Sequence, residues 1–391
     1  MIEFLFSDGE EICSYSDGVV KRQRSKFIEK YKQTAIDAER AKSWKHSGEG
    51  AQFRGDVRYG EDGVNFASSI NGIYPLADNT VAYSFTINRT SGIYITVPYD
   101  DKAQEVHIVN SVDYDFSGGC ADAGSNVLFC SLSRNAYNSD IAVFNLDTGD
   151  YKTVTDGDTL DCDPFVSPRN GNIIYFTSRG AGRDGQGNFI KYSPAAICKL
   201  NLSDMAIEEV AASDSLNYMK PIEFGGKLYA ITAPVKEKGV NPIIELLLMP
   251  FRIVQAIANF LNVFVKAFTG KSLASGGDNP AKGREYDSRR EYVKGNLINY
   301  EKELKKNKSK KDKDYGFIPK SWKLIEVGGG SVIKSGVADF DILPDGTFIV
   351  TNGRRIFAVK DGKTTKLCNT ENCLTVACVH RSQTKNDLFD F

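Results

Sequence analysis

Short runs of alternating apolar and polar residues, separated by turn residues, make up most of the chain. Alternation with a period of two predicts β-strands that bury one face, and turn residues between such runs predict hairpins. The clearest group contains the turns Asn170-Gly171 and Ser203-Asp204. Its predicted strands are Pro164–Ser167, Ile173–Ser178, Ala196–Leu202 and Ala206–Ala212. This stretch therefore predicts a four-stranded antiparallel unit.

The same kind of unit recurs on both sides of this stretch. The preceding unit has predicted strands at Tyr114–Phe116, Val127–Leu132, Ile141–Leu146 and Tyr151–Thr155. Further units occupy Asn71–Val109 and Val337–Leu367. Another begins with Tyr218–Phe224 and Lys227–Thr232 and is completed by Trp322–Val327 and Ser331–Ser335. Because one such sheet cannot bury both of its faces alone, the recurrence predicts a repeat architecture of sheets packed against one another.

Predicted strands at the two ends of the chain lack partners within these units. They are Glu3–Ser7, Glu11–Ser16 and Val19–Gln23 at the N-terminal end and Leu374–His380 at the C-terminal end. Pairing them completes a sixth sheet from both ends of the chain and leaves no exposed edge at the junction. We therefore expect a closed ring of six sheets.

One motif in the clearest unit resembles a known repeat. It reads Asp163-Pro164-Phe165-Val166-Ser167-Pro168-Arg169-Asn170-Gly171 and precedes a strand that ends Phe176-Thr177-Ser178. This layout resembles the WD40-like repeat of TolB-like proteins, D-x-P-x-W-S-P-D-G followed by a strand ending F-T-S, although Phe165 and Arg169-Asn170 depart from that consensus. The turn Leu343-Pro344-Asp345-Gly346 resembles it as well. The resemblance implies an all-β, six-bladed β-propeller.

A single propeller domain over residues 1–391 follows from this arrangement. We expect a closing blade from 1–24 with 373–391, a helix at 25–45, further blades over 68–235 and 320–370, and a helical, partly flexible insertion over 236–319. Strand parity places this insertion, the 25–45 helix and the Gly-rich loop Arg179–Ser193 on one face, beside the mouth of the central channel. Loops that converge on one face of a rigid scaffold are typical of a working surface.

The insertion contains an apolar helical pattern over residues 242–268. At about 100° per residue, its polar positions fall on one arc of a helix. The centre of the remaining apolar arc consists of Leu246, Ile253, Ile257, Leu261, Phe264 and Phe268. A lysine-rich stretch follows, which includes Lys305, Lys306, Lys310 and Lys311. An apolar helix face with lysines nearby is the combination that holds a peripheral protein on an anionic membrane surface.

Three interpretations of the 242–268 helix stay open at this point. It binds the membrane surface, it packs against its own propeller or a second copy of the chain as a dimer seam, or it enters the bilayer as a span or re-entrant hairpin. The regular polar stripe and the charged residues argue against a lone span that faces lipid on all sides. Pro250 is expected to break or kink the helix.

Composition and charge narrow the classes of function. A formal net charge of -1 argues against nucleic acid as an overall electrostatic partner. The first residues lack a basic segment followed by an apolar core, so we expect a cytoplasmic protein, with the inner membrane surface as the alternative location. The eight cysteines form no C-x-x-C pair and are expected to be buried free thiols.

Few residues indicate catalytic chemistry. The chain has no G-x-S-x-G elbow and no phosphate-binding glycine loop. The group that most resembles a cation site consists of Asp156, Asp158, Asp161 and Asp163. It lacks the glycine and the terminal glutamate that a calcium-binding loop has at fixed positions. We therefore assign no catalytic, cofactor-binding or metal-binding residue and no cofactor. Asp163 and Asp345 are expected to cap turns.

The sequence thus favours a non-catalytic scaffold, attached to the cytoplasmic membrane surface through the insertion, that presents its top face to a protein partner. The first alternative is an enzyme or small-ligand sensor that uses the central channel. The second is a structural protein that self-associates through the 242–268 helix.

Overall fold

The computed structural model describes residues 3–42, 68–235, 290–309 and 315–379, apart from positions 78, 88–89, 101, 103, 123–125, 136 and 295. Within these ranges the chain consists mainly of β-strands, together with helices α1 (Lys26–Lys42) and α4 (Tyr300–Ser309). No helix in the described ranges is long and apolar enough to cross a membrane. The predicted 242–268 helix lies outside the described residues.

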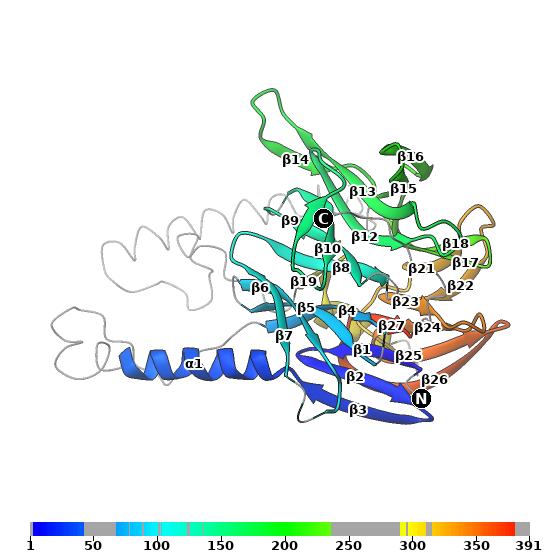
Figure 1. Cartoon of the computed structure of the whole chain (residues 1–391). Helices are drawn as coiled ribbons and strands as arrows, with labels where there is room; N and C mark the ends of the chain where they lie inside the picture. The colour runs from blue at the N-terminus through cyan, green and yellow to red at the C-terminus, as the bar shows by residue number, and fades with distance from the viewer. Residues whose placement is uncertain are drawn as a thin grey trace, which may run out of the picture.

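The sheets follow one another around a common centre in chain order, which makes the fold an all-β propeller (Figure 1). The closing sheet contains β1 (Phe4–Asp8), β2 (Glu11–Ser16), β3 (Val19–Arg24) and β27 (Val376–Cys378). The next contains β4 (Ser68–Pro75), β5 (Val81–Ile87), β6 (Thr90–Thr96) and β7 (Val106–Ser111).

Two further four-stranded sheets lie later in the chain. One contains β17 (Leu216–Phe224), β18 (Lys227–Pro234), β21 (Lys323–Glu326) and β22 (Val332–Ser335). The other contains β23 (Asp339–Ile342), β24 (Phe348–Thr351), β25 (Gly353–Lys360) and β26 (Lys363–Cys373). In the first of these sheets, the second and third strands are separated by the insertion, as the sequence predicts.

The middle of the chain forms a nine-stranded sheet with two antiparallel parts. The first part contains β8 (Asp115–Asp122), β9 (Val127–Ser133), β10 (Ser139–Asn145) and β11 (Tyr151–Thr153). The second contains β12 (Thr159–Val166), β13 (Ile173–Arg183), β14 (Phe189–Tyr192), β15 (Ala196–Asn201) and β16 (Ala206–Ala211). A parallel pairing of Ser139 with Leu160 joins the two parts. The count of six blades stays a prediction, because it requires counting these parts as separate blades.

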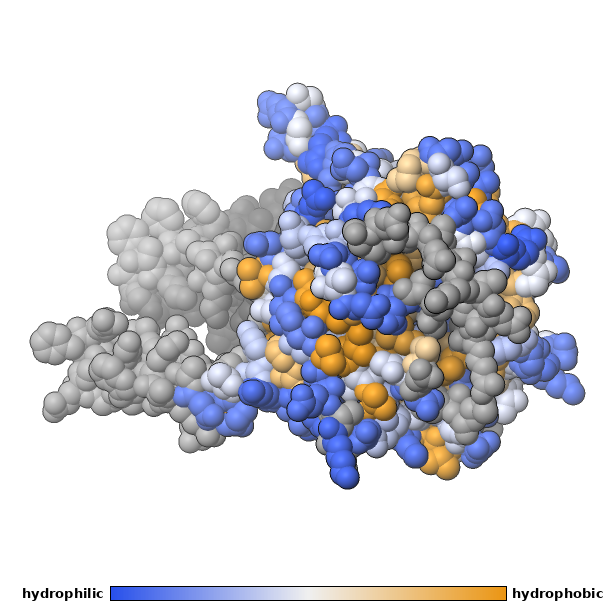
Figure 2. Space-filling model, viewed as in Figure 1, coloured by the Kyte–Doolittle hydropathy of each residue, from blue (hydrophilic) through white to orange (hydrophobic). Residues whose placement is uncertain are grey.

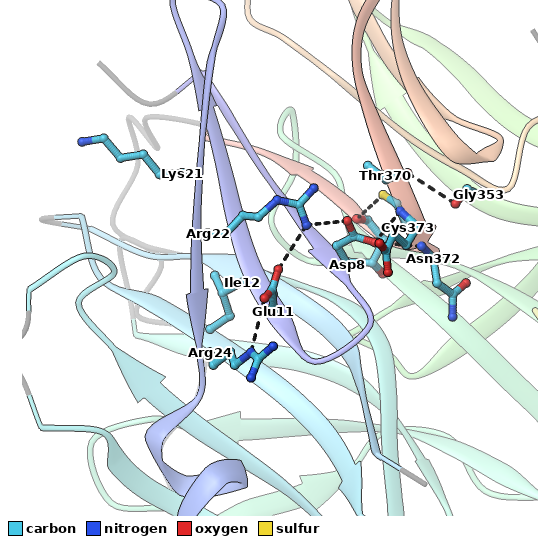
Figure 3. Close-up of polar contacts among 12 residues, drawn as sticks. Asp8, Glu11, Ile12, Lys21, Arg22, Arg24, Gly353, Thr370, Asn372 and Cys373 are labelled. Carbon is cyan, nitrogen blue, oxygen red and sulfur yellow. Dashed lines mark hydrogen bonds and ion pairs between the residues drawn. The ribbon is translucent and has the colours of Figure 1, made fainter.

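The ring closes through the two ends of the chain, as the sequence predicts. Strand β27 pairs antiparallel with β1, with Phe4 opposite Cys378 and Phe6 opposite Val376. Asp8 supports this junction, since its Oδ1 accepts the backbone N–H groups of Glu371 and Asn372 at 2.8 and 2.7 Å. Its Oδ2 pairs with Arg22 at 2.7 Å (Figure 3).

Large apolar side chains fill the spaces between neighbouring sheets. One cluster joins Tyr74 and Ile93 of the β4–β7 sheet to Phe116 and Phe144 of the β8–β11 part. Phe116 and Phe144 meet edge to face, with ring centroids 5.6 Å apart. Because each sheet is covered by its neighbours, the alternating strand pattern produces a core between the sheets.

Helix α1 packs against the β4–β7 sheet at its N-terminal end. Phe27 packs against both Phe85 and Tyr94, with ring centroids 5.2 and 4.4 Å away, and Ile28 is buried. Further along, the helix leads away from the sheets (Figure 1). The predicted helix at 25–45 is therefore confirmed over 26–42, and residues 43–45 lie outside the described part of the chain.

The predicted loop at Arg179–Ser193 is wrong. Strand β13 continues to Arg183 and pairs with β14, so this stretch is mostly a projecting hairpin. The small residues Gly180, Ala181 and Gly182 hide the alternation that would mark the strand in the sequence.

The insertion also contains a hairpin that sequence reasoning did not identify. It is formed by β19 (Arg290–Val293) and β20 (Asn296–Asn299), which make a two-stranded sheet of their own. Helix α4 follows it directly, and Tyr300 of α4 stacks near Phe317 with ring centroids 4.0 Å apart. These elements bring the end of the insertion back to the ring.

Candidate functional site

A cavity of about 380 Å³ lies where the inner strands converge, and we call it the central channel. Its walls come from β4, β8, β12, β17, β23 and β27, and the tip of the β19–β20 hairpin reaches into it. Figure 2 shows apolar surface near the middle of the viewed face, within a largely hydrophilic edge. The channel is therefore a concave, partly apolar site of the kind that binds ligands in many proteins.

Bulges in the inner strands bring particular residues to the channel wall. The strand register shifts in β8 at Ser117/Gly119, in β12 at Cys162/Phe165 and in β17 at Met219/Ile222. The residues within these bulges, Gly118, Asp163 and Lys220, have φ values of 50°, 51° and 49°. A bulge with a left-handed residue re-aims a side chain, and here Asp163 and Lys220 line the channel.

Hydroxyl groups of the preceding strands hold these bulges in place. Ser131 Oγ accepts the backbone N–H of Asp163 at 3.2 Å, and Thr177 Oγ1 accepts that of Lys220 at 3.1 Å. Both hydroxyl side chains are buried. The backbone that carries each charged side chain is therefore fixed by hydrogen bonds from a neighbouring part of the ring.

The charged side chains form a compact network inside the channel. Asp339 is 1% exposed and pairs with Lys220 Nζ through Oδ2 at 2.6 Å. Lys294, at the turn of the β19–β20 hairpin, places its Nζ 3.0 Å from Asp163 Oδ1 and 3.1 Å from Asp339 Oδ1. Three different segments thus meet at one ammonium group.

The network keeps Lys294 charged in spite of its burial. Burial lowers the pKa of Lys294, but the neighbouring Asp163 and Asp339 carboxylates raise it, and the net shift is upward. Loss of one partner from such a buried pair costs roughly 3–5 kcal/mol, because the other charge is then left uncompensated. Loss of Lys294 would therefore leave Asp163 without its cationic partner, while Asp339 would keep Lys220.

The channel network is connected to ring closure. Asp339 Oδ2 also accepts the backbone N–H of Val376 at 2.9 Å, and Asp341 Oδ2 accepts that of Cys378 at 2.7 Å. Both amides belong to β27, the strand that closes the ring. The two aspartates of β23 therefore position the closing strand as well as the channel wall.

Two thiols of the channel wall are poor nucleophiles. Burial raises the pKa of both Cys120 and Cys162 to about 12. At neutral pH these side chains are protonated thiols rather than reactive thiolates. The eight cysteines are all free in the structure, and Cys13, Cys130, Cys373 and Cys378 are buried, as expected from the sequence. Cys120, Cys162, Cys198 and Cys368 are only partly buried, so the expectation of burial is wrong for these four.

The hairpin that carries Lys294 is docked by polar and apolar contacts. Arg179 Nη2 donates to the backbone oxygen of Lys294 at 3.2 Å, and Asn296 Nδ2 donates to the same oxygen at 3.0 Å. Val293 and Ile298 are buried in the cluster that contains Met219 and Phe317. The hairpin is thus fixed at the channel mouth by contacts on both of its strands.

The predicted acidic group does not converge on one point. Asp156 is exposed, Asp158 pairs with Arg183, Asp161 accepts a hydrogen bond from Ser178 at 2.6 Å, and Asp163 faces the channel. Among the described residues, no group of three or more His, Cys, Asp or Glu side chains could hold a metal ion.

The turn-capping prediction is confirmed for Asp345 and wrong for Asp163. Asp345 Oδ1 accepts the backbone N–H of Thr347 at 2.9 Å, as expected for a capped turn. Asp163 instead lies in a bulge, where its carboxylate pairs with the Lys294 ammonium across the channel. The bulge directs this side chain away from its own turn.

Most of the predicted contact residues lie outside the described part of the chain. These are Leu246, Ile253, Ile257, Leu261, Phe264, Phe268, Lys310 and Lys311. Lys305 and Lys306 lie on α4 and pair with Glu301 at 3.9 Å and with Glu303 at 3.2 Å. These ion pairs reduce the positive charge that the two lysines present at the surface.

Sequence reasoning missed Lys220, Lys294 and Asp339 as site residues. A signal for Lys220 was present, because Lys220-Pro221 occupies the same place in its unit as Asp163-Pro164 does in the preceding one. Lys294 lies in the insertion, where no repeat register applies. That Lys294 lies in the channel is seen only in the structure, where the β19–β20 hairpin places it beside Asp163.

Comparisons with known proteins agree with a propeller and supply no family. No family model matches the chain, and no curated protein sequence matches it. TolB from Acinetobacter baumannii aligns over 96% of this chain and 66% of its own, at 11% identity and a TM-score of 0.45. A chain of the nidogen/laminin complex aligns over 96% of this chain and 97% of its own, at 9% identity and a TM-score of 0.47.

The tricorn protease aligns over 97% of this chain but only 36% of its own, at 12% identity and a TM-score of 0.40. These likenesses are too distant to carry an argument about activity. The class of protein, a β-propeller, is defined by the arrangement of the sheets themselves.

Proposed function

We propose that this chain is a non-catalytic binding propeller that receives a ligand or a partner segment at its central channel. The observation that carries the proposal is the cavity of about 380 Å³, into which the inner strands and the insertion direct their charged side chains. A preformed concave site with a few fixed polar groups is the usual form of a binding site.

The chemistry of the channel supports binding rather than catalysis. Its carboxylates are engaged, because Asp163 and Asp339 pair with lysines and Asp341 accepts a backbone amide. Its thiols at Cys120 and Cys162 are held protonated. A general base or an activated nucleophile needs a group that is free to take up a proton near neutral pH.

Occluding the channel tests this proposal. Ser117 lines the channel on β8, and Ser117→Trp places a large side chain in the cavity. Ser203→Trp, in an exposed turn, is the matched control. Each protein is purified from its native cells, and co-purifying proteins and small molecules are identified by mass spectrometry.

We expect one species to be retained by the wild type and Ser203→Trp and lost from Ser117→Trp, with circular dichroism unchanged. If all three proteins retain the same species, or if none retains any, the channel is not the binding region.

Membrane attachment is a second candidate, favoured by the apolar arc of residues 242–268. The described elements on either side of the insertion support it, because β18 pairs with the channel strand β17 and Val293 of β19 lines the channel. In this arrangement the face with the channel mouth lies toward the cytoplasmic surface of the membrane.

Flotation with liposomes of varied anionic lipid content tests membrane attachment. We expect binding that requires anionic lipid, weakens with salt and is lost in Ile257→Asp. Absence of binding, together with a concentration-dependent dimer in light scattering that Ile257→Asp abolishes, would instead support the self-associating alternative.

A further inference from the structure

One of the two cations in the channel, Lys294, comes from an element outside the ring, whereas the other, Lys220, belongs to strand β17. Lys294 lies at the turn of the β19–β20 hairpin, which forms a separate two-stranded sheet and adds no strand to the ring. An isolated two-stranded hairpin is at best marginally stable in water. The position of Lys294 therefore depends on the docking contacts of the hairpin.

The carboxylates that receive Lys294 belong to ring strands, and ring contacts hold the backbone of one and the side chain of the other. Asp163 lies in the β12 bulge, where Ser131 Oγ holds its backbone N–H. Asp339 is held through Oδ2 by the Val376 amide and by Lys220. Both remaining Oδ1 atoms lie within 3.1 Å of the Lys294 ammonium. The Asp339 carboxylate and the backbone of Asp163 are therefore positioned by the ring, and together they face one cation.

Charge balance shows why this pair of carboxylates needs an occupant. The charged side chains among the lining residues are Asp163, Asp339, Asp341, Lys220 and Lys294. Three carboxylates and two ammonium groups leave a net charge of -1, and withdrawal of Lys294 would leave -2. In a confined site this surplus is unfavourable unless another cation enters.

We propose that Asp163 and Asp339 form a recognition site for a primary ammonium group, which Lys294 occupies in cis and which an incoming ligand occupies when the hairpin withdraws. This inference rests on the proposed function, since the ligand enters the same channel. The ligand bears either a lysine side chain in a peptide or a free alkylamine. The hairpin thus competes with the ligand, because Lys294 and the ligand ammonium occupy the same site.

The geometry favours a primary ammonium over other cations. Two carboxylate oxygens lie 3.0 and 3.1 Å from a single nitrogen, which suits a compact group with three donors. A guanidinium is planar and spreads its donors over a wider fork, and a quaternary ammonium has no donor. The apolar residues of the wall, such as Ile73 and Phe165, suit an alkyl stem.

Chemical rescue of Lys294→Ala provides the test. n-Butylamine has the same four-carbon stem and ammonium group as the lysine side chain, and 1-butanol is its neutral counterpart. We expect Lys294→Ala to have a lower Tm than the wild type, and butylamine to restore it with saturation while 1-butanol does not. The wild type and the control Lys305→Ala, on the exposed face of α4, should not respond at the same concentrations.

A second substitution assigns the response to the acidic pair. In Lys294→Ala with Asp163→Asn, one of the two carboxylates is lost, and we expect the affinity for butylamine to fall at least tenfold. If Lys294→Ala responds to butylamine no more than the wild type does, the inference is wrong. An equal response with and without Asp163→Asn also contradicts it.

Hydrogen exchange on the unaltered protein keeps the test decisive if Lys294→Ala fails to fold. At concentrations above those of the Tm experiment, high enough to displace Lys294, a lysine-bearing peptide or butylamine should speed exchange of the amides in β19 and β20 and leave β9 unchanged. Unchanged exchange in β19 and β20 overturns the inference. A peptide that acts at concentrations at least tenfold lower than butylamine identifies a peptide ligand, and equal potency identifies a free amine.

The butylamine test of the ammonium site and the Ser117→Trp test of the proposed function can fail independently of each other. If butylamine fails to bind Lys294→Ala while Ser117→Trp still loses its bound species, the channel binds a ligand of another chemistry. If butylamine binds but Ser117→Trp retains the same species as the wild type, the ammonium site exists and the functional ligand binds elsewhere.

Discussion

At the scale of single residues, two buried carboxylates of this protein pair with cations from a different part of the ring. Lys220 of β17 meets Asp339 of β23, and Glu223 of β17 pairs with Arg169 from the turn after β12. Each pair spans two parts of the ring. Such pairs add specificity to the packing order, because a wrong neighbour would leave a buried charge alone.

Asp161 of β12 and Asp158, which directly precedes β12, should give opposite pH dependences of stability. Burial raises the pKa of Asp161, so the folded state binds its proton more tightly than the unfolded chain. Its contribution to stability is therefore greatest below the unfolded pKa of about 3.9 and falls as pH rises through the raised pKa. We expect Asp161→Asn to abolish this decline and to be more stable than the wild type near pH 7.

Asp158 is the matched control. A hydrogen bond from Arg183 lowers its pKa, so its contribution is present above the unfolded pKa and is lost as pH falls through the lowered value. Asp158→Asn should therefore be less stable than the wild type at neutral pH. Urea unfolding of the three proteins between about pH 3 and 7 measures both effects. Parallel stability curves for all three would contradict the assignment.

At the scale of elements, helix α1 depends on a carboxylate from another part of the chain. The carboxylate of Glu105 accepts the backbone N–H groups of Lys26 and Phe27 at 3.1 and 2.8 Å, and Ser25 Oγ accepts that of Ile28 at 3.1 Å. These bonds satisfy amides that a helix start leaves without intrahelical partners. The negative charge also lies at the favourable end of the helix dipole.

Removal of this carboxylate should loosen α1 selectively. We expect Glu105→Ala to lose about 1–3 kcal/mol of stability, because several charge-assisted hydrogen bonds disappear. Hydrogen exchange should accelerate in α1 and stay unchanged in β9. Glu29→Ala, an exposed acidic residue in the first turn, should cost about 0.3–1 kcal/mol. Equal effects of the two substitutions would show that Glu105 has no special role.

The elements could be predicted from the sequence where a single periodicity dominates. The second strand of the clearest unit begins at Ile173 in both the prediction and the structure, because alternation and the Asn170-Gly171 turn define it. The β13–β14 hairpin was missed because small residues carry no hydrophobic alternation. The β19–β20 hairpin was missed because its strands are only four residues long and lie beside charge-rich sequence.

At the scale of the whole molecule, closure of the ring makes the first and last described strands one structural unit. Phe4 of β1 is fully buried, lies opposite Cys378 and stacks on Tyr15 with ring centroids 4.9 Å apart. Because the sheets cover one another in turn, a defect at this junction exposes the faces of both neighbours.

Loss of the Phe4 side chain should therefore destabilise the entire ring. We expect Phe4→Ala to cost about 3–5 kcal/mol and to lower a single cooperative unfolding transition. Val19→Ala, on the exposed outer strand of the same sheet, should change stability by about 0.5 kcal/mol or less. Thermal unfolding followed by circular dichroism compares the two. A separate early transition in Phe4→Ala would indicate that the closing sheet unfolds on its own.

The channel site was harder to predict than the fold, for a geometric reason. Asp163, Lys220, Lys294 and Asp339 lie on four separate elements and meet only because the ring brings its inner strands together. The sequence does reveal the repeated X-Pro position that carries Asp163 and Lys220. It does not reveal which charges face each other across the channel, since that depends on the order and docking of the elements.

Site-specific photo-crosslinking in cells tests most directly whether the channel is the binding region. A photoreactive amino acid is placed at Ser117, in the channel, or at Ser203, in the exposed turn, and the adducts are identified by mass spectrometry. We predict a discrete adduct from position 117 that is absent from position 203. The same adducts from both positions, or none from position 117, would contradict this prediction.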